Sequence, residues 1–273
     1  MATQPGADAA FSGQVPELYE TYLVPLIFQP YADDLAARLA ARAPGRVLEV
    51  AAGTGVVTRA MASGLPAGSA IVATDLNQAM LDRAATIPIA RPVEWRQADA
   101  QQLPFPDETF DAVACQFGAM FFPDRPKAFA EARRVLRPGG VLLFNVWDRL
   151  EANEFADAVT QAVESVLAPD PPQFLRRTPY GYFDPEAIRL DLAAAGFPAP
   201  ARIDTLAARS RAASPRVPGV AFCEGTPLRG QIESHGPAML AEVTRAAEQV
   251  IARRFGAGAV DGAIQALVVT IEK

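Results

Sequence analysis

The chain of 273 residues is 50% hydrophobic and 21% charged, which is the composition of a globular protein and not of a largely disordered one. Its formal net charge of −6 argues against a generally basic surface for nucleic acid, and two cysteines and one histidine are too few for a disulfide framework or a cysteine- or histidine-rich metal site. No basic residue precedes Arg38 and no apolar run is long enough to span a bilayer, so we expect a cytoplasmic protein without membrane insertion.

The N-terminal part predicts a loose tail followed by two helices. The first 15 residues are rich in Ala, Gly and small polar groups. Tyr19, Tyr22, Leu23 and Leu26 then recur at helical spacing, and Pro25 predicts a kink or break. A second helix is expected from about residue 30 to residue 42, where Pro44 and Gly45 end it.

The middle of the chain alternates between short apolar strands and helices. Strands are expected at Arg46–Val50, Ala70–Thr74, Val93–Gln97, Phe110–Cys115 and Val141–Val146. Helices are expected between them at Gly55–Ser63, Asn77–Ala85 and Pro126–Leu136. This alternation predicts βαβ units, and therefore an α/β, doubly wound, mostly parallel sheet of the Rossmann-like class, with ligands at the carboxyl ends of the strands.

The C-terminal third is less regular. The sequence Asp184-Pro185-Glu186 predicts a helix start, and Gly196 predicts its end. Residues 202–206 and 266–271 read as strands, and residues 238–254 read as a helix. The stretch from Ser214 to Gly236 is punctuated by proline and glycine, and we expect no regular element there.

The clearest motif is an apolar strand that runs into a glycine turn and opens a helix, Val47-Leu48-Glu49-Val50-Ala51-Ala52-Gly53-Thr54-Gly55. Glycines at such a turn allow a tight bend and the close approach of a ligand to the backbone. Asp75 ends the next predicted strand, where a carboxylate can accept hydrogen bonds from ribose hydroxyls. The pattern therefore predicts a nucleoside-containing cofactor.

Two details distinguish between cofactors. A dinucleotide fingerprint requires a third glycine where this chain has Thr58, which weakens the case for an NAD oxidoreductase. Asp99 ends the third strand, where its carboxylate can accept from the exocyclic amine of adenine. Glu49 and Asp75 are expected to make the pocket acidic, which suits a sulfonium cation better than a diphosphate.

With these residues the sequence resembles the class I S-adenosylmethionine-dependent methyltransferases, and within them the small-molecule branch of the ubiquinone/menaquinone-biosynthesis enzymes. The resemblance extends over roughly residues 46–148 and includes Phe110-Asp111-Ala112-Val113 and Arg134-Val135-Leu136-Arg137-Pro138-Gly139-Gly140. It implies a seven-stranded sheet whose last strand is antiparallel, with N-terminal lid helices and C-terminal insertions. It also implies S-adenosyl-L-methionine as the cofactor.

Carried over by position, the resemblance implies that Ala51 to Gly55 wrap the methionine part of the cofactor and that Asp75 holds the ribose. Gln116 and Phe117 would line the methyl-transfer cleft. The chain departs from the family at Ala51, which replaces the first motif glycine. The complete set of expected cofactor-binding residues is Tyr22, Ala51, Gly53, Gly55, Asp75, Leu76, Asp99, Ala100, Gln116 and Phe117.

We expect one methyltransferase domain over residues 1–273, with lid helices in 1–44, the cofactor-binding core in 45–148, and substrate-cover insertions with the closing strands in 149–273. For Tyr19 and Tyr22, ordinary core packing stays an alternative to a lid. The long segments 150–182 and 207–262 would cover a small-molecule substrate. Six of their side chains suggest an apolar or aromatic one: Phe155, Phe174, Tyr180, Tyr182, Phe183 and Phe222.

Other functions stay open at this point. An RNA or protein methyltransferase is opposed by the acidic balance and by Gln116-Phe117-Gly118, which lacks the signature of adenine-amine enzymes. A catalytically inactive protein that binds S-adenosylmethionine would carry the same motifs, and a homodimer is left open. We assign no catalytic residue and no metal ligand, because Cys115 reads as a buried strand cysteine and His235 as a solvated loop residue.

Overall fold

The structure is a computed structural model that describes residues 8, 11, 13–198 and 200–273. The expected loose tail over residues 1–15 therefore lies largely outside the described residues. No helix in the described ranges combines the length and the apolarity needed to cross a membrane.

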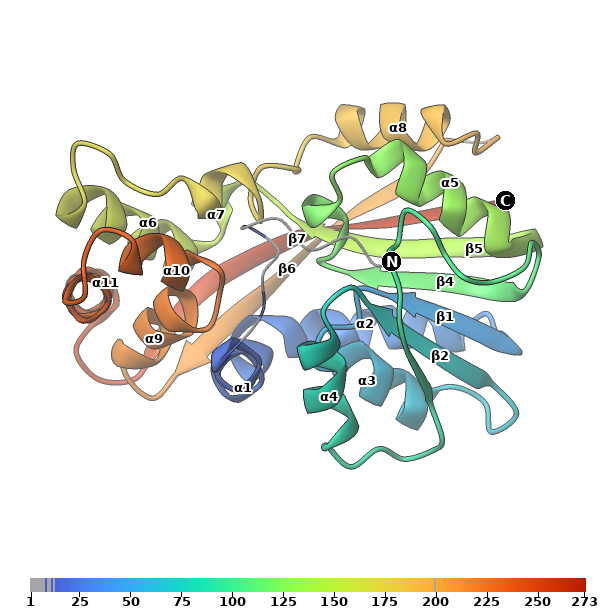
Figure 1. Cartoon of the computed structure of the whole chain (residues 1–273), viewed down its shortest axis with the longest axis horizontal. Coiled ribbons are helices and arrows are strands. Elements are labelled where there is room, and N and C mark those ends of the chain that lie inside the picture. The colour runs from blue at the N-terminus through green and yellow to red at the C-terminus, as the bar shows by residue number, and fades with distance from the viewer. Residues whose placement is uncertain (1–7, 9–10, 12, 199) are drawn as a thin grey trace.

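A sheet of seven strands in the described part of the chain has the order β3-β2-β1-β4-β5-β7-β6 (Figure 1). Its first five strands pair in parallel. β1 and β4 are almost wholly buried, as continuous apolar strands between two layers of helices should be. The five strands are β1 (Arg46–Val50), β2 (Ala70–Asp75), β3 (Glu94–Gln97), β4 (Phe110–Gln116) and β5 (Leu136–Trp147).

The two closing strands are β6 (Arg202–Ala212) and β7 (Val260–Glu272), and β7 is antiparallel to both β5 and β6. This confirms the expected seven-stranded fold with an antiparallel last strand. Both strands are longer than predicted. The added part of β6 carries Arg209 and Arg211, which pair with Asp261 on the neighbouring strand β7 instead of packing in a core. Polar cross-strand pairs of this kind leave no apolar pattern to detect.

Helices cover both faces of the sheet. Figure 1 shows α5 and α8 on one side and α2, α3 and α4 on the other. The predicted start of α8 is confirmed, because Asp184 accepts a hydrogen bond from the Glu186 N–H at 2.9 Å, and Gly196 follows the helix at φ +84°. The five helices are α2 (Gln29–Ala40), α3 (Val56–Gly64), α4 (Gln78–Ala85), α5 (Arg125–Val135) and α8 (Pro185–Ala194).

The helical segment before the sheet is not broken at Pro25. α1 (Val15–Leu18) continues into a π-helix, η2 (Tyr19–Phe28), which contains Pro25 and leads directly into α2. A wider helical turn gives the proline ring room beside the preceding turn and requires no N–H from it. Of the predicted kink or break, the break is therefore wrong, and the chain instead changes to π-helical geometry around Pro25. Leu23, Leu26 and Ile27 are buried in the core.

A second group of helices gathers around the outer part of β6 and β7 (Figure 1). Two of them, α9 (Arg216–Glu224) and α10 (Leu228–Glu233), lie in the stretch where no regular element was expected. Pro215 and Pro227 stand at their N-caps, where a missing N–H costs nothing, so these prolines begin helices instead of preventing them. The others are α6 (Glu154–Val166), α7 (Phe174–Arg177) and α11 (Met239–Phe255).

Candidate functional site

A cavity of about 590 Å³ lies where β1, β2 and β4 end. Its wall combines the loops after these strands with the η2 helix and the turn after α7. Of the ten residues expected to bind a cofactor, eight line this cavity: Ala51, Gly53, Asp75, Leu76, Asp99, Ala100, Gln116 and Phe117. The sheet register explains the gathering, because Val50 pairs with Thr74 and so brings the glycine turn beside Asp75.

Asp75 is held by the backbone of the two loops that it joins. Its Oδ2 accepts the Gly53 N–H at 2.8 Å, and its Oδ1 accepts the Asn77 N–H at 2.8 Å. Burial raises the pKa of Asp75, and the hydrogen bonds from these two amides act in the opposite direction. Oδ1 also accepts from the Asn77 side-chain amide at 3.4 Å, whereas Oδ2 retains a second lone pair, so Asp75 can also accept from a hydroxyl in the cavity.

The two glycines of the turn have different tasks. Gly53 lies in the wall at φ +57°, and a Cβ there would come within 3.5 Å of Met80. Gly55 is the N-cap of α3 at φ +82°, and it lies outside the described wall. A Cβ at Gly55 would lie 2.8 Å from Cη2 of Trp95, so this glycine serves the turn and the packing behind it.

Ala51 adopts φ +55°, the left-handed conformation for which the family uses glycine. Its methyl group faces Gly118, and a Cβ at Gly118 would overlap the Ala51 Cβ and lie 2.8 Å from Cys115 Sγ. The missing side chain at residue 118 therefore gives Ala51 its room.

Glu49 does not belong to the described wall. It is 1% exposed and accepts a hydrogen bond from the Thr58 hydroxyl. Burial raises the pKa of Glu49 to about 8, which leaves the carboxyl largely protonated at neutral pH. The expectation that Glu49 makes the pocket acidic is therefore wrong. Thr58, which replaces the third glycine of a dinucleotide site, is the hydrogen-bond partner of this buried carboxyl.

Leu76, Asp99 and Ala100 line the end of the cavity next to β3. Asp99 Oδ1 accepts the Gln101 N–H at 2.8 Å, which orients the carboxylate within its own turn. The Gln97 side chain donates to the Leu76 carbonyl at 2.8 Å and joins the two loops.

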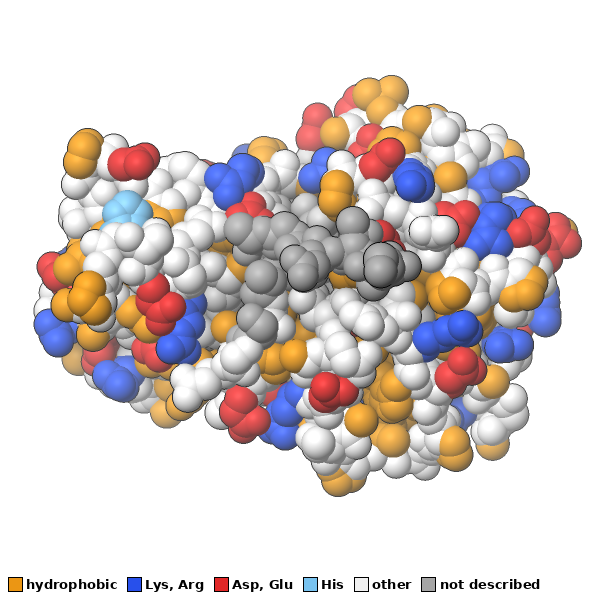
Figure 2. Space-filling view, in the orientation of Figure 1, with side chains coloured by type: hydrophobic (Ala, Val, Ile, Leu, Met, Phe, Trp, Pro, Cys, Tyr) orange, Lys and Arg blue, Asp and Glu red, His pale blue; other side chains and the backbone are white. Residues whose placement is uncertain are grey.

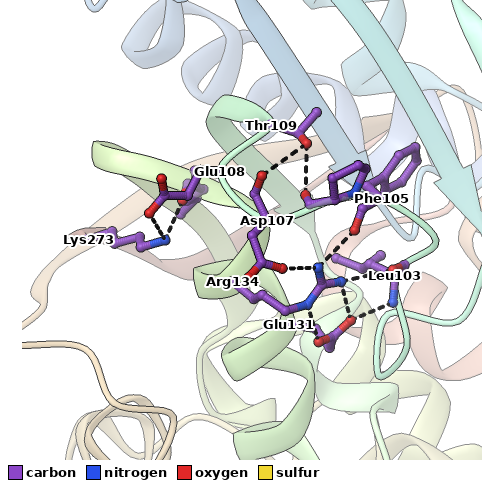
Figure 3. A network of polar contacts seen from close by, with 10 residues as sticks. Leu103, Phe105, Asp107, Glu108, Thr109, Glu131, Arg134 and Lys273 are labelled. Carbon is purple, nitrogen blue, oxygen red and sulfur yellow. Dashed lines mark hydrogen bonds and ion pairs between the residues drawn. The ribbon is translucent and has the colours of Figure 1, made fainter.

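The loop that follows Asp99 is fixed to α5 by Arg134 (Figure 3). The guanidinium donates to Glu131 and Asp107, and also to the carbonyls of Leu103 and Phe105 at 3.0 and 2.8 Å. Glu131 in turn accepts the Leu103 N–H at 2.8 Å. The planar fork of arginine suits this combination of carboxylate and carbonyl acceptors. The resemblance used Arg134 only as a motif residue, whereas the structure shows what it holds.

Aromatic side chains form the other end of the cavity. Phe117 stacks on Trp147 with ring centroids 3.8 Å apart, and Tyr180 follows at 5.8 Å from Trp147. Another ring pair reaches back toward the glycine turn: Tyr19 stacks on Phe28 at 4.9 Å, and its hydroxyl lies about 3.9 Å from where a Gly53 Cβ would be. Burial raises the pKa values of Tyr19 and Tyr180 above the ordinary phenol range, so both stay neutral hydrogen-bonding groups at physiological pH.

Sequence reasoning chose Tyr22 for the site, and the structure places Tyr19 there instead. Tyr19, Leu23 and Ile27 line the cavity, whereas Tyr22 is half-buried outside its described wall. The spacing of four residues between these three side chains was the available signal. Trp147 was also missed, because it ends β5 without a motif of its own.

Of the six side chains proposed to cover a substrate, Phe174, Tyr180 and Phe222 line the cavity. The remaining three have other surroundings. Phe155 packs against Phe255 and Gly262, Tyr182 lies under Arg125 and donates to Asp191, and Phe183 is 41% exposed.

His235 and Cys115 have the surroundings expected from the sequence. His235 is exposed and lies outside the described wall, and Cys115 is buried in β4, where burial raises its thiol pKa to about 12. Within the described residues, no three His, Cys, Asp or Glu side chains are grouped so that they could hold a metal ion.

Known proteins resemble this chain most closely over its first half. The Methyltransferase domain family (Methyltransf_11) matches residues 48–144. The ubiquinone/menaquinone biosynthesis C-methyltransferase UbiE of Saccharophagus degradans is 40% identical over 106 residues, which are 37% of this chain and 43% of that protein. UbiE of Geobacter sulfurreducens is 41% identical over 100 residues, which are 35% of this chain and 39% of that protein. The match thus spans less than half the length of these curated relatives.

Solved structures extend the similarity of fold to most of the chain. The YcgJ protein of Bacillus subtilis aligns with a TM-score of 0.56 at 18% identity and covers 89% of this chain and 98% of its own. A phosphoethanolamine N-methyltransferase 2 of Haemonchus contortus aligns with a TM-score of 0.58 at 17% identity. The alignment covers 94% of this chain and 56% of that protein. Residues 48–144 thus match the methyltransferase domain family and are similar to the UbiE enzymes, and the strand order agrees with the fold of the class I S-adenosylmethionine-dependent methyltransferases.

Proposed function

We propose that this protein transfers the methyl group of S-adenosylmethionine to a small-molecule acceptor with an apolar or aromatic body. One observation carries the proposal: a single cavity has Gly53, Asp75 and Asp99 at one end and the stacked rings of Phe117 and Trp147 at the other. A donor and an acceptor bound in one such cavity are held close together and away from water, which is the main help that a methyl transfer needs.

The residues present fit the cofactor. Asp75 Oδ2 keeps a lone pair for a ribose hydroxyl, and Gly53 leaves a cradle that a Cβ would narrow. We assign the adenine edge to Asp99 and Ala100, which line the same cavity. We assign the methionine end to residues 51–53 and the cleft to Gln116 and Phe117, with Tyr19 in the place proposed for Tyr22. Bound S-adenosylmethionine would supply a methyl group already activated on a sulfonium centre.

The character of the described wall favours an acceptor that needs no strong base. Its tyrosines are neutral, and Asp75 is already occupied by two backbone amides. A hydroxyl acceptor requires removal of a proton, whereas an activated carbon or a neutral amine does not. We therefore propose a carbon or nitrogen acceptor. The C-methylation named for the UbiE relatives agrees with the first of these.

The buried position of the cavity supports a small molecule over RNA or protein. Its wall includes Phe11, whose ring meets Tyr19 at 5.9 Å and Phe121 at 5.8 Å, so these side chains narrow the entrance. On the face drawn in Figure 2, acidic and basic side chains are interspersed and not gathered by sign. Action in the cytoplasm without a nucleic-acid partner is part of the proposal, and it rests on the sequence.

The test has two stages. Calorimetry should show micromolar binding of S-adenosylhomocysteine and no comparable binding of NAD, and the reverse result would contradict the cofactor assignment. Labelled methyl transfer from S-adenosylmethionine to pooled aromatic amines and activated ring carbons should then give a product by mass spectrometry. A protein that binds the cofactor but methylates no member of the pools would support the inactive alternative.

A further inference from the structure

The mouth of the cavity holds a carboxylate in an unusually complete set of donors. The Asp8 carboxylate accepts three hydrogen bonds from Arg177, with Nε at 3.1 Å and Nη2 at 2.9 and 2.8 Å. It also accepts from the Thr178 hydroxyl at 2.6 Å and from the Gln231 amide at 2.8 Å. A bidentate guanidinium with two further donors is the arrangement that proteins use to recognise carboxylates.

These donors are positioned by the fold and not by Asp8. Arg177 ends α7, and the chain then turns back so that the Tyr180 N–H bonds to the Leu175 carbonyl at 3.0 Å. A side chain at Gly181 would overlap the Arg177 carbonyl oxygen, so the turn depends on that glycine. Gln231 comes from α10, a separate element.

The donor set also adjoins the aromatic end of the cavity. Arg177 and Thr178 both line it, together with Tyr180 and Phe174 from the same segment. Arg125 is another cation of the described wall, and its buried Nε has no hydrogen-bond partner in the part of the chain that the structure describes. A ligand in the aromatic end could therefore reach positive donors without leaving the cavity.

Building on the proposed function, we propose that Arg177, Thr178 and Gln231 form a carboxylate subsite and that the methyl acceptor is an aromatic carboxylic acid. The acid's carboxylate takes the place that the Asp8 side chain fills in this structure. Its ring lies against the aromatic wall. The assignment also agrees with the net charge of −6, because a half-exposed guanidinium that lines the cavity gives an acidic protein a local site that attracts anions.

The test compares acids with their neutral amides. Calorimetry with and without S-adenosylhomocysteine would use benzoate, phenylacetate, indole-3-acetate and pyrenebutyrate, each beside its primary amide. We expect at least one acid to bind at least tenfold more tightly than its amide. In Arg177→Gln this preference should fall to about one. Asp8→Asn, which removes the competing carboxylate, should bind the same acid severalfold more tightly than wild type.

The chain offers a matched control in Arg176, the preceding residue. Its guanidinium pairs with Glu164 at 2.9 Å and Glu151 at 3.6 Å, outside the described wall. Arg176→Gln should keep the full preference for the acid. If circular dichroism shows that Arg177→Gln is unfolded, Gln231→Leu serves instead and should lose part of the preference.

Several results would overturn the subsite: no acid that binds more tightly than its amide, an equal loss in Arg176→Gln, or no gain in Asp8→Asn. Failure of the proposed function is distinguishable from these. It would show as absent binding of S-adenosylhomocysteine while the Arg177-dependent preference persists. Binding of S-adenosylhomocysteine without any preference for acids would remove the subsite and leave the proposed function standing.

Discussion

The Ala51 methyl group fills the position that a side chain at Gly118 would need, so only one of these two residues can carry a Cβ without a clash. Ala51 stands at φ +55°, where a residue with a Cβ is strained and achiral glycine is not. The departure of this chain from the family's glycine pattern is thus accommodated by a glycine on the neighbouring loop, 67 residues later in the sequence (118 − 51 = 67).

The first prediction tests this pair. Gly118→Ala should lower the free energy of unfolding by about 1–3 kcal/mol, because its methyl group would overlap Ala51 and press on Cys115. Adding Ala51→Gly should recover part of that loss. Urea unfolding of the two single variants and the double variant measures the coupling. Gly68→Ala is the control, since a Cβ there meets nothing within 4 Å. Strict additivity of the two changes would show that the residues do not compete.

The second prediction concerns Asp75. Asp75→Ala should weaken binding of S-adenosylhomocysteine by about 1.5–3 kcal/mol, the usual effect of losing hydrogen bonds to a charged group. It should also destabilise the fold, because the N–H groups of Gly53 and Asn77 would lose their acceptors. Asp75→Asn keeps one acceptor oxygen for these two amides and should fall between wild type and alanine in both measurements.

Calorimetry and urea unfolding separate the two effects. The exposed Asp82 on α4 provides the matched control, and Asp82→Asn should change neither quantity. Wild-type affinity in Asp75→Ala would show that Asp75 shapes the turn without contacting the cofactor.

The third prediction is a pH dependence at Glu49. Burial raises the pKa of this carboxyl from 4.5 to about 8, so between these values the folded protein holds a proton that the unfolded chain releases. The contribution of Glu49 to the free energy of unfolding must therefore fall as the pH rises from about 4.5 to about 8, by up to about 1.4 kcal/mol per pH unit. Above pH 8 it should level off.

Glu49→Gln removes this titration and leaves an acceptor for the Thr58 hydroxyl. The variant should therefore gain stability relative to wild type as the pH is raised from 5 to 8 in parallel urea titrations. Glu94→Gln, at an exposed position of β3, is the control, and its free energy of unfolding should change with pH as that of wild type does. A constant difference between Glu49→Gln and wild type across this range would mean that Glu49 is ionised in the folded protein.

Features that depend on neighbours in the sequence could be predicted, and features that depend on distant contacts could not. β1 was predicted with its observed bounds because three of its five residues, Val47, Leu48 and Val50, are apolar, as in a strand buried on both faces. Asp75 and Gly53 were predicted because parallel strands end at one edge of a sheet, so residues that follow them meet there. The outer half of β6 was missed because Arg209 and Arg211 stabilise it through Asp261, a partner about fifty residues away.

The same distinction applies to the site. The protonation of Glu49 and the room for Ala51 depend on neighbours that only the folded chain brings together. The carboxylate donors Arg177 and Gln231 lie on separate helices and share no motif. Short-range periodicity contains no information about such contacts, although it predicts the elements that make them.

The last prediction distinguishes Tyr19 from Tyr22 and asks whether their helix acts as a lid. Tyr19→Leu should weaken S-adenosylhomocysteine binding severalfold, because the tyrosine hydroxyl lies about 3.9 Å from where a Gly53 Cβ would be and its ring stacks on Phe28. Tyr22→Leu, outside the described wall, should bind like wild type.

Hydrogen exchange tests whether the helix acts as a lid. Protection of residues 17–28 should rise when S-adenosylhomocysteine is added, as for a segment that closes over its ligand. Leu23, Leu26 and Ile27 are already buried without ligand, so the rise should be concentrated in the turn around Tyr19, and deletion of residues 1–28 should destabilise the whole fold. Equal protection with and without ligand would make this helix permanent core packing, and Tyr19 would then be a fixed part of the cavity wall.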